Sequence, residues 1–339
     1  MAVVKADAYG HGVQAVAQTA IDAGAAYLAV ALIEEAMELR ECGISHPVLV
    51  FGGELQSQIR HIIQHDVEIT IFSKGFAREL SRMALKNNVK CMVHVKVDTG
   101  MGRVGVPHHD AVDFISDIID LDGIEIKGIY THFATSDERD KEYANLQLKR
   151  FDDIIRQLAD LNINIPLKHA ANSGAILDMP ATYYDMVRPG VMIYGYYPST
   201  ETTESVVLKQ AMRFKSKVSF VKEVPGGTAV SYGRKYVTRE PTRIATIPVG
   251  YADGYNRLLS NRGKVIINGH VYPVAGRVCM DQILIDVGMR HPVAVGDDVL
   301  LFGSDGENGF SVYDICELVN TIPYEVCCWI SKRVPRVYI

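Results

Sequence analysis

The stretch AVVKADAYGHGVQAVAQTAIDAG, residues 2–24, sets a pattern that the first part of the chain repeats. Its apolar run at 2–5 is typical of a buried strand, and residues 12–24 carry apolar side chains at helical spacing. Further strand-like runs lie at 27–31, 47–51, 68–72, 91–97, 125–130, 166–169 and 184–187. Amphipathic helical stretches lie between them at 33–42, 54–65, 74–87, 108–119, 140–161 and 172–178. This alternation predicts parallel strands joined by crossover helices.

Eight such strands predict an α/β fold of the (β/α)8 TIM-like barrel type. An open, doubly wound sheet is the alternative. Only seven helical stretches accompany the strands, and the chain begins on a strand without a polar lead-in. We therefore expect that a leading segment preceded residue 1, which could supply the eighth helix and a strand of the following domain.

The pattern of predicted elements changes after a polar, turn-rich segment at 197–205, which we interpret as a linker. Runs of strand length then follow at 213–224, 242–249, 264–267, 270–275, 282–287 and 298–302, with a short helix expected near 311–319. Asn268-Gly269 between two apolar runs is a strong hairpin signal. The predicted domains are therefore a barrel, 1–198, and a mainly β C-terminal domain, 206–339.

Composition limits the possible partners. The 339 residues have a net charge of -5 and no Lys/Arg cluster, so we expect neither a nucleic-acid nor a membrane-surface partner. No apolar run reaches the length of about 18 residues that a membrane span needs, so we expect neither a membrane span nor a signal peptide. The six cysteines have no CxxC or Cys/His metal spacing, which predicts no metal site and a cytoplasmic protein with reduced thiols.

The segment VKADAYGHG, residues 4–12, is the first candidate for chemistry. A lysine that ends an apolar strand is costly to bury unless its charge is used or removed. At the carboxyl end of a barrel strand it would lie where active sites form, and a desolvated amine suits covalent chemistry with a carbonyl group. A lysine that merely extends its amine into solvent is the simpler alternative.

This nonapeptide resembles the cofactor-lysine motif of the alanine racemase family, although that family more often has Asn where this chain has Asp7. The resemblance continues, in order, through nearly the whole chain. It implies an amino-acid racemase that depends on pyridoxal 5'-phosphate. Lys5 would bind the cofactor covalently and act as one catalytic base, and Tyr9 would contribute to the cofactor site.

Two further motifs carry the resemblance along the predicted barrel. In KVDTGMGR, 96–103, Arg103 resembles the arginine that contacts the cofactor's phenolic oxygen and the substrate carboxylate, a role that suits a fixed guanidinium. Lys96 resembles a lysine that is carbamylated in some members, and an ordinary strand lysine is the alternative. His132, in THFA, resembles a histidine near the cofactor ring; a packed or surface histidine is the alternative.

Phosphate-binding positions are implied at two predicted strand ends. Ser173, in HAANS, and Gly190 and Val191, in VRPGV, resemble the residues that bind the cofactor phosphate, which needs N–H donors, hydroxyls and small residues. Tyr324, in PYEV, resembles the tyrosine that closes over this phosphate.

Arg188 resembles the arginine that faces the pyridine nitrogen of the cofactor. Because arginine stays charged and only donates hydrogen bonds, the ring nitrogen would remain unprotonated. This would weaken the electron sink and suppress side reactions such as transamination. Without the resemblance, a surface arginine before a turn is the simpler reading.

Tyr232, in VSYG, resembles the second base of the family. Racemisation removes a proton from one face of Cα and delivers one to the other, which two groups such as Lys5 and Tyr232 could do. A phenol with a pKa of about 10 is a poor base at neutral pH. The family partners that relay charge to it would be His132 and Arg188.

The resemblance also implies a homodimer with shared active sites. Tyr251, in the segment 248–255, and Met280, in RVCMD, resemble substrate-binding residues, and Met280 would contribute its backbone N–H to the substrate carboxylate. In the family these residues and the second base come from the other subunit.

The sequence leaves three alternative functions open. The first is interconversion of L- and D-alanine, which supplies D-alanine for peptidoglycan. The second is a serine/alanine racemase of the glycopeptide-resistance type, which tends to have a smaller polar residue where Tyr324 stands and a preceding membrane domain. The third is a non-enzymatic pyridoxal phosphate homeostasis protein, which would lack the second domain and its SYG segment. Decarboxylases with a similar barrel use other second-domain motifs.

Overall fold

The computed structural model describes residues 1–53, 55–305 and 308–339. The chain divides into two compact units, Met1–Leu208 and Lys209–Ile339, and each is described by itself. In the part of the chain described, no helix combines the length and apolar character needed to cross a membrane.

Parallel strands form the sheet of the first unit. Its order is β1 (Ala2–Val3), β2 (Leu28–Val30), β3 (Val48–Val50), β4 (Glu68–Ile71), β5 (Cys91–Asp98), β7 (Ile124–Tyr130) and β8 (Leu167–His169), with β6 (Val106–Pro107) paired to β5. Each strand pairs in parallel with the next along this order. The first seven strands predicted from the sequence are therefore confirmed.

The predicted eighth strand, 184–187, is not a regular strand, which corrects the prediction. Its segment nevertheless joins the two edges of the sheet. The N–H groups of Asp185 and Arg188 donate to carbonyls in and just after β8 (3.0 and 2.9 Å), and the N–H of Val3 donates to the carbonyl of Pro189 (3.1 Å). Tyr184, the first residue of the segment, has a φ of 46°, which a regular strand does not allow. The sheet closes as a barrel, in place of the doubly wound alternative.

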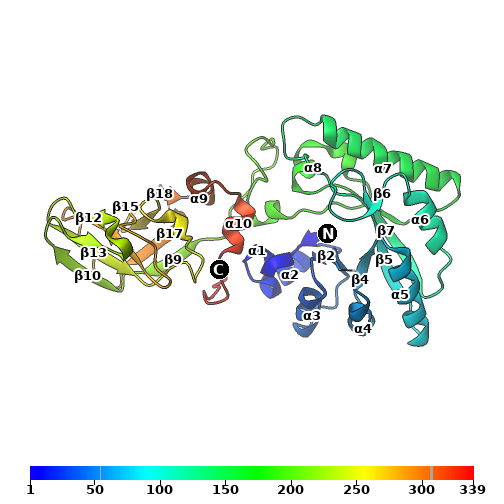
Figure 1. Cartoon of the computed structure of the whole chain (residues 1–339), viewed down its shortest axis with the longest axis horizontal. Helices are drawn as coiled ribbons and strands as arrows, with labels where there is room; N and C mark the ends of the chain where they lie inside the picture. The colour runs from blue at the N-terminus through cyan, green and yellow to red at the C-terminus, as the bar shows by residue number, and fades with distance from the viewer. Residues whose placement is uncertain (54, 306–307) are drawn as a thin grey trace. The chain divides into compact units, whose positions relative to one another are not determined.

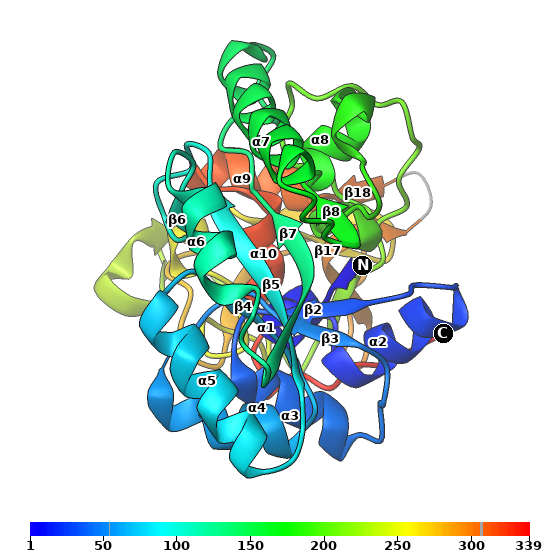
Figure 2. The same cartoon turned by 90° about the vertical axis from the view of Figure 1, so that its right-hand side faces the viewer.

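Helices lie around the outside of this sheet, as Figures 1 and 2 show. They are α2 (Val13–Asp22), α3 (Ile33–Glu41), α4 (Ile59–Gln64), α5 (Lys74–Lys86), α6 (Ala111–Ile118), α7 (Glu142–Asp160) and α8 (Ser173–Asp178). Each lies within one predicted helical stretch. Short 3-10 turns add η1 (Gln56–Gln58), η2 (Pro180–Thr182) and η3 (Val191–Tyr194).

Polar side chains line the inner face of the barrel strands. On β5, Val93, Val95 and Val97 are fully buried on one face. Strand alternation places His94 and Lys96 on the opposite, inner face. There the Lys96 amine lies 5.0 Å from the ring centre of Tyr130 on β7. Barrel interiors are usually filled by branched apolar residues, so this polar filling indicates a functional interior.

The second unit is mainly antiparallel. Its strands are β9 (Phe214–Lys217), β10 (Phe220–Val224), β11 (Ala229–Val230), β12 (Tyr236–Val237), β13 (Thr242–Ile247), β14 (Lys264–Ile267), β15 (His270–Pro273), β16 (Ile283–Asp286), β17 (Asp298–Asp305) and β18 (Asn308–Phe310). They form the sheets β10-β13-β16, β11-β12 and β15-β14-β17-β18, with β9 paired to β17. Val230, Ile244 and Ala275 belong to one buried core cluster.

Most predicted elements of this unit are confirmed, including the hairpin at Asn268-Gly269, where both residues have positive φ. The single run predicted at 213–224 is wrong, because it is two strands. At Val218 and Ser219 the backbone N–H groups donate to different partners, Asp297 and Thr246, so the chain passes from one sheet to another. Helix α9 (Val312–Val319) was expected, whereas α10 (Pro323–Cys328) was not.

Candidate active site

Lys5 lies two residues beyond the end of β1, at the carboxyl end of the sheet, and begins α1 (Lys5–Tyr9), a left-handed turn. Its residues Ala6, Asp7, Ala8 and Tyr9 have φ of 55, 54, 53 and 52°. A left-handed helical conformation costs about 1–2 kcal/mol for each non-glycine residue. Strain of this kind persists only where surrounding contacts hold it, and it clusters at functional sites.

Two carboxylates hold this turn. Glu35 accepts hydrogen bonds from the N–H of Ala6 (2.5 Å) and the N–H of Ala31 (2.7 Å), which ties the turn to the start of α3. Asp7 accepts from the N–H of Val13 at the start of α2 (2.8 Å), where negative charge is favourable. Asp7 therefore anchors the turn that carries Lys5.

Two helix starts and a glycine lie beside Tyr9. Ser173 begins α8 and Val191 begins η3, and the first N–H groups of a helix have no acceptor within it and favour anions. The N–H of Gly190 donates to Ser173 Oγ (3.0 Å). A Cβ on Gly190 would come 2.8 Å from Tyr9 Oη, so only glycine leaves this space open. This donor set fits the phosphate of the implied cofactor.

Arg188 is buried, and its guanidinium holds several groups in place. Its Nη2 donates to the carbonyls of Thr131 (2.6 Å) and Ala170 (2.9 Å) and lies 3.4 Å from His132 Nδ1. Its Nη1 lies 3.0 Å from His169 Nδ1. Burial lowers the pKa of Arg188 to about 10, so it remains charged at neutral pH.

His132 follows β7 and lies among the cations of the site. Burial, and then the charges of Arg188, Lys96, Arg103 and Lys5, lower the pKa of His132 well below its ordinary value. The imidazole is therefore neutral near pH 7. The carbonyl of His132 accepts a hydrogen bond from the buried side chain of Gln147 (3.1 Å), which fixes the backbone here.

Lys96 is a buried amine beside this cluster. It is 3% exposed, and its Nζ donates to the carbonyl of Val97 (3.3 Å). Burial and the charge of Arg188 lower its pKa well below the ordinary value, which favours a neutral, nucleophilic amine. Arg103 is exposed on the loop after β5, which Asp98 shapes by accepting from nearby backbone N–H groups.

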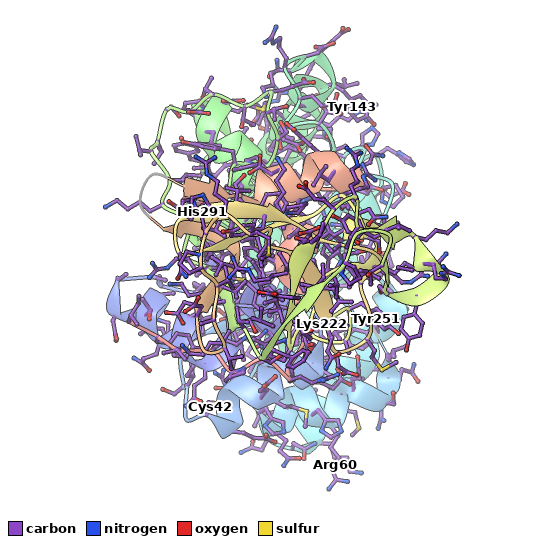
Figure 3. The ribbon with its side chains drawn as sticks, turned by 90° about the vertical axis from the view of Figure 1, so that its left-hand side faces the viewer. Cys42, Arg60, Tyr143, Lys222, Tyr251 and His291 are labelled. Atoms are coloured by element: carbon purple, nitrogen blue, oxygen red, sulfur yellow. The ribbon has the colours of Figure 1, made fainter. Side chains whose placement is uncertain are left out.

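The second unit has its own group of predicted site residues on its surface. Tyr232, Tyr251 and Met280 are 69%, 42% and 52% exposed, and Tyr251 is labelled in Figure 3. Tyr251 donates its N–H to the carbonyl of Cys279 (3.1 Å), which places its segment beside Met280. Ser231, just before Tyr232, has φ 65° and ψ −178°, a conformation that only glycine adopts readily.

Tyr324 is the second residue of α10 and is partly exposed. The end of α10 packs on the loop after β13, since a Cβ on Gly254 would come 2.6 Å from the carbonyl of Trp329. The predicted site residues of the first unit are Lys5, Tyr9, Lys96, Arg103, His132, Ser173, Arg188, Gly190 and Val191. Those of the second unit are Tyr232, Tyr251, Met280 and Tyr324.

Sequence reasoning missed several residues that support the site. Glu35 has no local signal, because its partner Ala6 is distant in sequence. His94 and Glu68 form a partly buried pair (2.7 Å) that no motif indicated. The polar residues at alternate positions of β5 were the available signal for an inner polar face.

Comparison with known proteins agrees with this geometry. The family described as alanine racemase, N-terminal domain, matches residues 1–198, and that described as alanine racemase, C-terminal domain, matches residues 211–338. Alanine racemase 2 of Caldanaerobacter subterraneus subsp. tengcongensis is 49% identical, with 100% of this chain and 88% of that protein covered. The alanine racemase of Halothermothrix orenii is also 49% identical, over 100% of this chain and 89% of that protein. A solved structure of alanine racemase from Clostridium difficile 630 has a TM-score of 0.96 at 40% identity and covers 100% of this chain and 88% of its own.

Proposed function

We propose, from the premise that the chain belongs to the alanine racemase family and is therefore an isomerase, that two proton carriers, Lys5 and Tyr232, interconvert L- and D-alanine. The implied cofactor is pyridoxal 5'-phosphate, which when bound supplies an electron sink for the carbanion at Cα. The observation that carries the proposal is that Lys5 and His132, which follow β1 and β7, lie near each other and near Arg188, which follows the irregular segment 184–187.

Each of the two bases would transfer the proton through one atom of its side chain. The Lys5 amine would move a proton at Nζ on one face of Cα, and the Tyr232 phenol would do so at Oη on the other. Because Arg188 can only donate, a neutral His132 accepts from it at Nδ1 and carries its proton at Nε2, from which it would donate a hydrogen bond to the Tyr232 oxygen. The fixed charge of Arg188 would favour the deprotonated phenol during transfer.

The remaining residues bind and orient. Ser173, Gly190, Val191 and Tyr9 would hold the cofactor phosphate, and Tyr324 would close over it. Arg188 would hold the pyridine nitrogen as a hydrogen-bond acceptor, because arginine only donates.

The substrate carboxylate would meet a second set of groups. Arg103 and the backbone N–H of Met280 would bind it, and Tyr251 would border the substrate. We propose that Lys96 is carbamylated, because its buried amine has a lowered pKa and Arg103 is close enough to affect it. The carbamate would then be an anionic partner for Arg103.

A homodimer with shared active sites is proposed to bring the two groups of residues together. Three large side chains of the second unit, Tyr232, Tyr251 and Met280, are exposed, whereas catalysis needs them covered. The barrel mouth of a second copy is the surface that would cover them. The partners of this chain are thus a second copy and a small amino acid.

Alanine is the preferred substrate in this proposal, because the bulk of Tyr324 would narrow the pocket. A physiological role in D-alanine supply for peptidoglycan follows. We also propose a cytoplasmic location, since Cys42, Cys91, Cys279 and Cys316 are free thiols, as a reducing compartment keeps them.

The test is an assay of the purified chain with L-alanine and with L-serine, with and without added pyridoxal phosphate, alongside its mass by analytical ultracentrifugation. We expect a dimer that racemises L-alanine, with activity lost on removal of the cofactor. A clear preference for serine, or full activity as a monomer, would contradict the corresponding part of the proposal.

A further inference from the structure

A chain of four polar side chains runs through the interior of the barrel, from Arg188 to Glu68. Arg188 Nη1 lies 3.0 Å from His169 Nδ1, and His169 Nε2 lies 2.9 Å from His94 Nδ1. His94 Nε2 lies 2.7 Å from Glu68 Oε2. The chain therefore connects the site arginine to the first residue of β4, at the amino end of the sheet.

The chemistry of the two ends sets the direction of every hydrogen bond. Arginine only donates, so His169 accepts at Nδ1 and carries its proton at Nε2. That proton is donated to His94 Nδ1, which leaves the His94 proton on Nε2. An ionised carboxylate only accepts, so Glu68 completes the series. Both imidazoles are neutral in this arrangement, in agreement with burial and the charge of Arg188, which lower the pKa of His169.

The barrel strands leave room for the two histidine side chains of this hydrogen-bonded series. A Cβ on Gly128 of β7 would come 2.2 Å from His94 Nδ1, so any other residue there would displace the imidazole. The pairing of β5 with β7 shifts register between Val93 and His94. The Tyr130 ring stacks on His169 at 4.7 Å with an interplanar angle of 8°. His94 and His169 are fully buried, and the Glu68 side chain is 13% exposed.

The same series of hydrogen bonds links the positive charge of Arg188 to the carboxylate of Glu68. The described acceptors around its guanidinium are carbonyls and imidazole nitrogens, which are neutral. A buried cation needs compensation, and Glu68 lies at the far end of a series of polarised hydrogen bonds that starts at Arg188.

We propose that Glu68 is a positioning residue for the reaction, which acts through His94 and His169 to hold the Arg188 guanidinium in place beneath the cofactor site. Its link to catalysis rests on the proposed function, but its effect on the imidazoles does not. Without an acceptor at position 68, the His94 ring loses its anchor and the hydrogen bond from His169 Nε2 weakens.

The test compares holoenzyme variants by 15N-edited NMR of the imidazole N–H groups. In Glu68→Leu the His169 Nε2 proton should exchange with solvent about tenfold faster than in the wild type, the effect of one lost hydrogen bond. Glu68→Gln keeps an acceptor oxygen and should restore the wild-type rate. Glu125→Leu removes a carboxylate from β7 that pairs with exposed Lys90 instead, and should change nothing.

The steady-state kinetics of the same variants are a second test of the proposal. Glu68→Leu should lower kcat for alanine about tenfold with KM changed less than about twofold, and Glu68→Gln should recover most of the loss. If Glu68→Leu does not fold, Gly128→Ala moves the His94 ring directly, and the His169 proton should again exchange faster. An unchanged exchange rate in either folded variant would overturn the proposal. An inactive wild type with the expected exchange rates would contradict only the racemase assignment.

Discussion

Gly190 lies directly against the hydroxyl group of Tyr9. A Cβ on Gly190 would come 2.8 Å from Tyr9 Oη and 3.8 Å from Ser173 Oγ. The φ of Gly190 is −111°, so the glycine does not serve a left-handed backbone, and the close approach of Tyr9 is the feature that favours it. The position where a phosphate is proposed to bind is thus kept open by a missing side chain.

Gly190→Ala should therefore weaken cofactor binding. Overpacking of this kind costs about 1–3 kcal/mol, which would raise the Kd of pyridoxal phosphate by about tenfold to a hundredfold. Fluorescence titration of the apoprotein would measure it. Gly75→Ala is a matched control, because its Cβ would meet nothing closer than 3.7 Å. Equal affinities for the two variants would argue against a phosphate at this position.

Lys5→Ala should abolish the visible absorbance of the bound cofactor, because the amine that binds it covalently is gone. Activity with alanine should fall at least about a thousandfold. Lys149→Ala, at an exposed position of α7, serves as the control and should leave the spectrum unchanged. A wild-type spectrum in the Lys5 variant would rule out Lys5 as the anchor.

Lys96 should react with carbon dioxide, because its buried amine has a lowered pKa and is neutral more often than an ordinary lysine amine. We expect a carbamate signal in the 13C NMR spectrum after equilibration with labelled bicarbonate. The signal should be missing in Lys96→Ala. Its persistence in that variant would assign the modification to another amine.

Acid should destabilise the barrel through His132. Its folded-state pKa lies below the ordinary 6.5, so below pH 6.5 the unfolded chain binds a proton that the folded chain does not. Stability is therefore present above pH 6.5 and is lost as the pH falls, with a slope of about 1.4 kcal/mol per pH unit for this group. Urea unfolding across this range would measure the slope.

His132→Gln should lower the slope of the unfolding free energy against pH by about 1.4 kcal/mol per pH unit, which corresponds to one proton. His109→Gln, at a histidine whose side chain is 69% exposed, should not lower it. The slope, rather than the absolute stability, is the relevant quantity, since either variant can change the latter. Identical slopes for His132→Gln and the wild type would contradict a buried, neutral His132.

The regular parts of the fold were predictable because their hydrophobic spacing is strong. Helix α5, for example, was expected at 74–87 and spans Lys74–Lys86. The two-residue strands β11 and β12 were not predicted, since they depend on pairing with each other rather than on local pattern. The segment at 184–187 has the apolar pattern of a strand, but its residue Tyr184 has a φ of 46°, which a regular strand does not allow.

The site was predictable in its residues but not in its geometry. Motifs indicated Lys5 and Arg188, yet nothing in the residues Ala6–Tyr9 signals a left-handed turn, because alanine favours right-handed helix. The turn depends on Glu35, which is far away in sequence. In the same way, the chain from Arg188 to Glu68 requires the register of four strands and the small size of Gly128, which only the folded barrel reveals.

The exchange of the Cα proton of alanine with deuterated solvent, started separately from each enantiomer, tests the central claim most directly. With two bases on opposite faces, Tyr232→Phe should slow exchange from one enantiomer by about a hundredfold or more and affect the other far less. Tyr236→Phe, whose hydroxyl bonds to Asp286 (2.6 Å), should affect both little. Equal loss from both enantiomers in Tyr232→Phe, or no loss at all, would contradict the account.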